Sequence, residues 1–67
     1  MHTKIKELRK QNRISQEILA KAVGVTRQTI TSIECEKYTA SLELAYKIAK
    51  HFNLSIEEVF DLESEEN

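Results

Sequence analysis

The sequence predicts an all-α protein, a compact bundle of five short helices. Three observations indicate this class: two helices joined by a tight turn over residues 16–34, an apolar stripe with helical spacing over residues 42–52, and a capping pattern that opens a last helix at residue 56. With 67 residues the chain is expected to form one domain, residues 1–67, in which residues 61–67 make an acidic, frayed tail.

The two central helices are separated by the only glycine of the chain. The first is predicted from about Gln16 to Val23, with Ser15 as its N-cap, and Gly24 follows where a left-handed residue ends a helix. Thr26 caps the second helix, which ends near Glu34. The apolar residues expected to form their shared core are Leu19, Val23, Val25, Ile30 and Ile33. This is a helix-turn-helix pattern.

The outward face of the second helix carries side chains suited to DNA bases. Arg27 offers a bidentate fork to guanine, Gln28 offers a donor and an acceptor to adenine, and Thr31 and Ser32 can take either role. Most polar helix faces are simply solvated. Because this one lies inside a complete turn pattern, we favour DNA recognition.

An ordered set of motifs extends over residues 4 to 60. Its segments are Ile5-Lys-Glu-Leu-Arg9, Ile14-Ser-Gln-Glu17, Leu19-Ala20, Val23-Gly-Val-Thr-Arg-Gln-Thr-Ile30, Ile33-Glu34, Lys37-Tyr38 and Ser41-Leu42. This set resembles the phage-repressor or Cro-like helix-turn-helix family, also called the XRE family. The resemblance implies a bundle of the lambda-repressor-like DNA-binding type and an ion pair between Arg9 and Glu34.

The loop after residue 34 departs from that family. Members usually have Asn-Gly-Lys where this chain has Cys35-Glu36-Lys37, and a proline is common where this chain has Ala40. Glycine permits a positive φ, so Glu36 either is strained there or lies in a different loop. A lone cysteine such as Cys35 is more often a packing residue than a reactive thiol.

The remaining helices follow from periodicity and caps. The first helix is expected from residue 3 or 4 to Gln11, and the fourth from Leu42 to Phe52 with Ser41 as its cap. Ser55-Ile-Glu-Glu58 is a capping box that opens a short helix from about Ile56 to Phe60.

Charge is divided along the chain. Residues 1–37 hold eight basic and four acidic residues, a net charge of +4, whereas residues 38–67 hold two basic and seven acidic residues, a net charge of −5. The helix-turn-helix lies in the positive half, so the overall net charge of −1 does not exclude phosphate binding.

Several other function classes find no support. The sequence shows no nucleophile–base set, phosphate loop or Cys/His cluster, so we expect neither an enzyme nor a metal or other cofactor. We also expect no second domain for a small-molecule effector, no membrane span and no signal peptide. The single cysteine suits a reducing interior, and we expect a cytoplasmic location.

The predicted function is sequence-specific binding of double-stranded DNA by a transcriptional regulator, with repression as the simplest mechanism. Bases would be read by Arg27, Gln28 and Ser32, with Thr31 flanking. Phosphates would be held by Gln16 and Thr26 on one strand and by Lys37 and Tyr38 on the other. The alternative is an antitoxin-type protein-interaction module with the same fold.

We expect the working unit to be a homodimer on a near-palindromic operator, because one recognition helix covers only a few base pairs. Val59, Phe60 and Leu62 offer apolar area for the dimer surface. Two alternatives stay open: Leu62 packs on its own core, or the chain end pairs with the chain start near Met1 in a small sheet.

Overall fold

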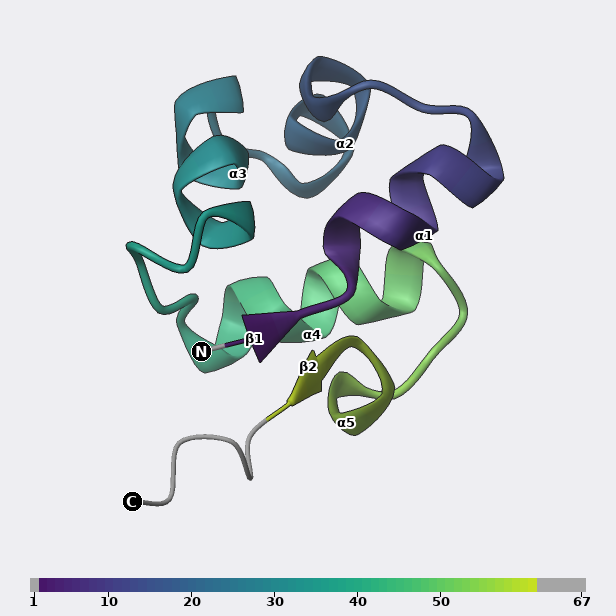
Figure 1. Ribbon diagram of the computed structural model, residues 1–67, viewed down its shortest axis with the longest axis vertical. Helices are drawn as coiled ribbons and strands as arrows, with labels where there is room; N and C mark the ends of the chain where they lie inside the picture. Colours follow the sequence, from purple (N-terminus) through teal and green to yellow (C-terminus); the bar gives the residue numbers. More distant parts are fainter. Residues whose placement is uncertain (1, 62–67) are drawn as a thin grey trace.

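The computed structural model describes residues 2–61 and, within them, shows five helices with a short strand at each end (Figure 1). The predicted all-α bundle is confirmed, with a minor two-stranded sheet added. The elements in chain order are β1 His2–Thr3, α1 Ile5–Asn12, α2 Gln16–Val23, α3 Arg27–Glu34, α4 Leu42–His51, α5 Ile56–Val59 and β2 Phe60–Asp61.

Four of the five helices begin at a serine or threonine whose hydroxyl caps the first turn. The side-chain oxygens of Ser15, Thr26, Ser41 and Ser55 accept the backbone N–H three residues later, at 3.0 to 3.2 Å. The capping box of α5 is complete, because the Ser55 N–H also donates to the Glu58 carboxylate at 2.8 Å. These caps satisfy N–H groups that have no partner within the helix, which is why the predicted starts are correct.

Helix α1 begins and ends slightly later than the sequence indicated. Its N-cap Lys4 makes no side-chain cap, and the Lys4 N–H donates instead to the Val59 carbonyl at 2.8 Å. At the other end Arg13 takes a left-handed conformation with φ 59° and closes the helix after Asn12. The start of α1 thus depends on a contact with α5 and its end on a left-handed residue, and the hydrophobic pattern predicts neither.

The two ends of the described chain pair in an antiparallel sheet. His2 lies opposite Asp61 and Thr3 opposite Phe60. Helix α5 therefore stops at Val59, and the prediction that it extends to Phe60 is wrong. Asp61 belongs to β2 and not to the acidic tail expected from residue 61. The rest of that expected tail, residues 62–67, lies outside the described residues.

The sheet also changes the expected dimer surface. Val59 is 0% exposed and Phe60 is 1% exposed, so both side chains belong to the core of their own chain. Burying a side chain of this size stabilises a fold by roughly 1.5–3 kcal/mol. The prediction that Val59 and Phe60 offer free apolar area is wrong, and Leu62 lies outside the described residues.

One hydrophobic core joins all five helices. Of the core predicted for α2 and α3, Leu19, Val23, Ile30 and Ile33 are buried, while Val25 is half-buried against the cluster. The buried apolar residues are Ile5, Leu19, Ala20, Val23, Ile30, Ile33, Ala40, Leu44, Ala45, Ile48, Ala49, Val59 and Phe60. This shared core holds α2 and α3 at a fixed angle to the rest of the bundle (Figure 1). Within residues 2–61, no helix has the length and apolar character needed to cross a membrane.

Candidate nucleic-acid interface

The turn between α2 and α3 has the predicted geometry. Gly24 ends α2 with φ 81°, and the Val25 N–H donates back to the Ala20 carbonyl at 2.9 Å. Thr26 then starts α3, where its hydroxyl accepts the Thr29 N–H at 3.2 Å. The left-handed glycine lets the chain reverse within three residues, so that α3 lies across α2.

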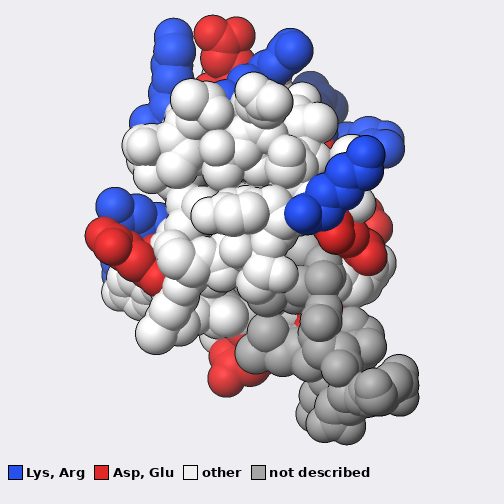
Figure 2. Space-filling model, turned by 90° about the vertical axis from the view of Figure 1, so that its left-hand side faces the viewer, with Lys and Arg blue, Asp and Glu red and all other residues white. Residues whose placement is uncertain are grey.

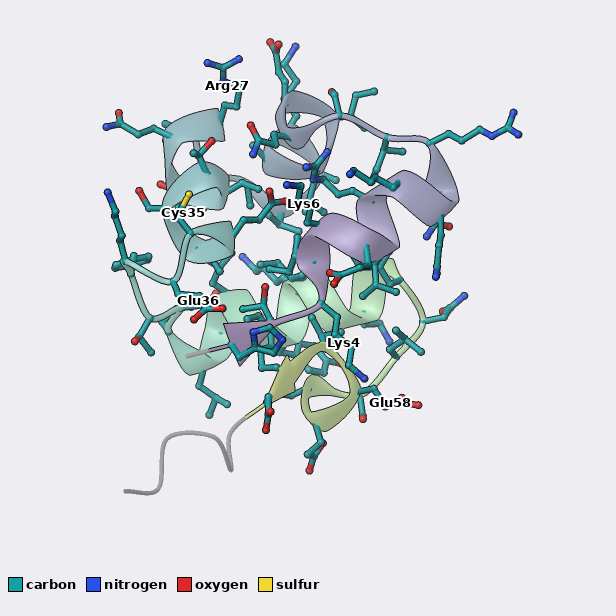
Figure 3. The ribbon with its side chains drawn as sticks, viewed as in Figure 1. Lys4, Lys6, Arg27, Cys35, Glu36 and Glu58 are labelled. Carbon is teal, nitrogen blue, oxygen red and sulfur yellow. The ribbon has the colours of Figure 1, made fainter. Side chains whose placement is uncertain are left out.

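The polar side chains of α3 fall into two rows, each one helical turn long. Arg27 precedes Thr31 in one row, and Gln28 precedes Ser32 in the other. Arg27 and Gln28 are exposed, whereas Thr31 and Ser32 are half-buried. The Arg27 side chain extends outward from the start of α3 (Figure 3).

The surface around α3 is uncharged at its centre and charged at its edges. Figure 2 shows that uncharged side chains occupy most of this face, while lysine and arginine side chains lie around its upper edge and on both sides, with acidic side chains beside them. Neutral donors and acceptors at the centre suit base edges, and the cations at the edges can meet the phosphates on either side.

A shallow hollow of about 270 Å³ lies beside the second row. It is lined by Thr26, Gln28, Thr29, Ser32 and Tyr38. The structure thus brings the predicted residues Thr26, Gln28, Ser32 and Tyr38 together. Thr29 was missed in the sequence, although its position three residues before Ser32 on one helix face was a usable signal.

A second hollow of about 290 Å³ lies beside the first row. Its walls include Gln16 and Arg27, together with Ser15, Glu17 and Arg9. Gln16 is the first residue of α2, where backbone N–H groups lack partners within the helix. A guanidinium, an amide and a helix start in one place can hold a phosphate oxygen.

A network of hydrogen bonds ties this second hollow to α1. The Arg9 guanidinium donates to both oxygens of Glu34, at 2.6 and 3.1 Å, which confirms the pair that the resemblance implied. Gln16 donates to the same carboxylate at 3.0 Å, and the Thr31 hydroxyl donates to Gln16 at 3.0 Å. Thr31, expected to flank the base contacts, therefore bonds toward α2.

The loop after α3 holds the remaining predicted contact. Lys37 is exposed and lines neither hollow, so the structure does not bring it together with the other candidates. Glu36 has φ 63°, which is the strained outcome that the missing glycine indicated. Its carboxylate lies 2.8 Å from His2 Nδ1, which links the loop to β1. Cys35 is exposed, so it is not a packing residue of the core.

Comparisons with known proteins agree with this geometry. A family model described as helix-turn-helix matches residues 5–59. The chain belongs to the XRE-type helix-turn-helix family. The matched region contains all five helices of the described residues and both hollows. Membership in this family identifies a DNA-binding regulator and not an enzyme.

Similar proteins occur in archaea and in a bacterium, and each bears the name of an uncharacterized HTH-type transcriptional regulator. One from Archaeoglobus fulgidus is 53% identical over 98% of this chain and 93% of its own length. Another from Methanocaldococcus jannaschii is 50% identical over 98% of this chain and 100% of its own length. YgzD of Bacillus subtilis is 52% identical over 97% of this chain and 98% of its own length.

Proposed function

We propose that this helix-turn-helix protein is a sequence-specific regulator that represses transcription as a homodimer on a near-palindromic DNA operator. The observation that carries the proposal is the exposed start of α3, where Arg27 and Gln28 stand between two hollows. Base-reading groups thus have a site for phosphate on each side.

In this reading α3 enters the major groove. Arg27 donates two hydrogen bonds to a guanine, Gln28 pairs with an adenine, and Ser32 contacts a neighbouring base. Gln16 and Thr26 hold phosphates of one strand through side chains and helix-start N–H groups, while Lys37 and Tyr38 contact the other strand.

Repression needs only occupancy, because a bound dimer excludes polymerase or another factor from the same DNA. The relatives' names as transcriptional regulators support a role at promoters. We place this activity in the cytoplasm, which agrees with the single free cysteine.

The decisive experiment is selection of binding sites from random duplexes, followed by titration of the selected duplex and a scrambled duplex at several salt concentrations. We expect a selected site with two related halves and a preference over the scrambled duplex of at least about a thousandfold. Equal affinity for both duplexes at every salt concentration would contradict sequence-specific recognition.

The direction of regulation needs a separate measurement. A reporter gene with the selected site inside its promoter should lose expression when the protein is supplied, and the Arg27→Ala variant should restore it. Increased expression with the wild-type protein would indicate an activator.

A further inference from the structure

The side chain of Gln16 is held at both ends of its amide. Its Nε2 donates to Glu34 Oε1 at 3.0 Å, and its Oε1 accepts a hydrogen bond from the Thr31 hydroxyl at 3.0 Å. Because an ionised carboxylate only accepts, the partner Glu34 requires the amide nitrogen to face it. The amide orientation is therefore set, and one N–H of Nε2 stays available.

The anchor for this amide is an ion pair with little exposure. The side chains of Arg9 and Glu34 are 12% and 6% exposed, and two hydrogen bonds join them. Arg9 also donates to the Ile14 carbonyl at 3.2 Å, in the segment that precedes α2. Glu34 on α3 is thus held by Arg9 on α1, and Gln16 on α2 donates to the carboxylate held in this way. The position of the Gln16 amide therefore depends on all three helices.

The Thr31 hydroxyl is already engaged within the protein. It has a single proton and two acceptors in reach, Gln16 Oε1 at 3.0 Å and the Arg27 carbonyl at 3.1 Å. Thr31 is also half-buried, one turn after Arg27 in the row of α3 beside the second hollow. A hydroxyl engaged in this way has no proton left to donate to a base edge.

We propose that Thr31 is a positioning residue, which together with Glu34 holds the Gln16 amide so that its remaining N–H donates to a DNA phosphate oxygen in the hollow shared with Arg27. The inference rests on the proposed DNA-binding function. It replaces the expected role of Thr31 beside the base contacts with a role in phosphate binding. Thr31 acts on affinity for every duplex and has no part in sequence preference.

A double-mutant cycle between positions 16 and 31 tests this role. Thr31→Val keeps the shape and removes the hydroxyl, so affinity for the selected and the scrambled duplex should fall equally, by about two- to tenfold. Thr31→Ser keeps the hydroxyl and should restore affinity to within about twofold. In a Gln16→Ala background, Thr31→Val should have no further effect.

Two further readouts separate positioning from a general structural effect. Neither glutamine nor threonine carries charge, so the salt dependence of binding should keep its slope in every variant. Thr29→Val is the matched control, because the Thr29 hydroxyl lies 3.2 Å from the Thr26 hydroxyl and does not contact Gln16. Its effect on binding should be the same with and without Gln16→Ala.

The results that would overturn the inference are distinct from those that would overturn the proposed function. Two results would show that Thr31 does not act through Gln16. One is that Thr31→Val lowers DNA affinity as much in the Gln16→Ala background as in the wild type. The other is that Thr31→Val changes the base preference in site selection. If the wild-type protein binds no duplex at all, DNA binding itself is wrong.

Discussion

At the scale of residues, the start of α3 presents two proposed base-reading side chains in different directions. Arg27 and Gln28 are exposed on consecutive positions, and each lines a different hollow. Since helix positions one apart point in different directions, we expect the two side chains to reach different base pairs in the proposed complex. Single substitutions at these positions should therefore affect different parts of the operator.

Arg27→Ala and Gln28→Ala should each weaken binding to the selected operator by about 1–3 kcal/mol and relax the preference at one base position. Affinity for scrambled DNA should fall more for Arg27→Ala, because only that change removes a charge. Site selection with each variant measures the effect. Selection of the same operator with unchanged affinity would show that these residues do not read bases.

Lys37 is an exposed candidate contact that lines neither hollow. If it pairs with a phosphate, Lys37→Ala should reduce the slope of log affinity against log salt by about 0.9 and leave sequence preference unchanged. Lys4→Ala is the matched control, since Lys4 lies near α5 and away from the start of α3 (Figure 3). Equal slopes for the wild type and Lys37→Ala would place Lys37 in solvent in the complex.

Glu36 carries backbone strain that its side chain compensates only weakly. Its φ of 63° suits glycine, and its bond with His2 joins side chains that are 46% and 52% exposed, where such pairs contribute little. Glu36→Gly should raise the free energy of unfolding by about 0.4–1 kcal/mol in denaturant titrations. Glu36→Gln is the control: it removes the carboxylate charge, keeps the backbone restricted, and should leave the free energy of unfolding almost unchanged. A lower free energy of unfolding in Glu36→Gly would show that the backbone at this position is not strained.

At the scale of elements, local signals define the helix starts and the α2–α3 turn. At four helix starts a side-chain oxygen accepts the backbone N–H three residues later, so the sequence signal for the start lies within four residues. These capping residues are Ser15, Thr26, Ser41 and Ser55. The turn between α2 and α3 requires Gly24, because its positive φ ends α2 and redirects the chain.

Gly24→Val should lower the free energy of unfolding by about 1–3 kcal/mol through backbone strain. A Cβ at this position meets no atom within 4 Å, so the expected cost comes from the backbone conformation and not from a clash of the Cβ. Gly24→Asn should cost less, since asparagine tolerates the left-handed conformation. Thermal denaturation of the three proteins gives the order, and equal stability of Gly24→Val and the wild type would mean that the turn relaxes without cost.

At the scale of the whole molecule, the candidate DNA-binding groups and the acidic helix α5 lie at different ends. The start of α3 with Arg27 is at the upper end, whereas α5 with Glu58 is at the lower end, where Lys4 also lies (Figure 3). The overall charge of −1 therefore does not describe the charge close to Arg27.

The proposed homodimer makes a geometric prediction. Two copies related by a two-fold axis should bind half-sites about one DNA turn, or ~34 Å, apart. Insertion of about five base pairs between the half-sites rotates one half by half a DNA turn and should reduce affinity to that of a single half-site. Insertion of about ten base pairs restores the rotation and should weaken affinity less. Sedimentation equilibrium of the complex should give two chains per operator; one chain on a non-palindromic site would refute the dimer.

The sequence was sufficient for the local features: the four caps, the left-handed Gly24 and the exposed Arg27 and Gln28 on α3. Each depends on residues within about one helical turn, so periodicity and capping rules reach them. The pair between Arg9 and Glu34 came only from family resemblance, because 25 positions separate the two residues.

Only the tertiary structure decided which neighbours surround the ambiguous side chains. The strand at residues 60–61 forms because its partner lies at the other end of the described chain, and this pairing places Phe60 in the core. Thr31 bonds toward α2 because the Gln16 amide, which also donates to Glu34, lies there, and Cys35 at the end of α3 is exposed. Such contacts join positions far apart in sequence, where neither helix periodicity nor capping carries a signal.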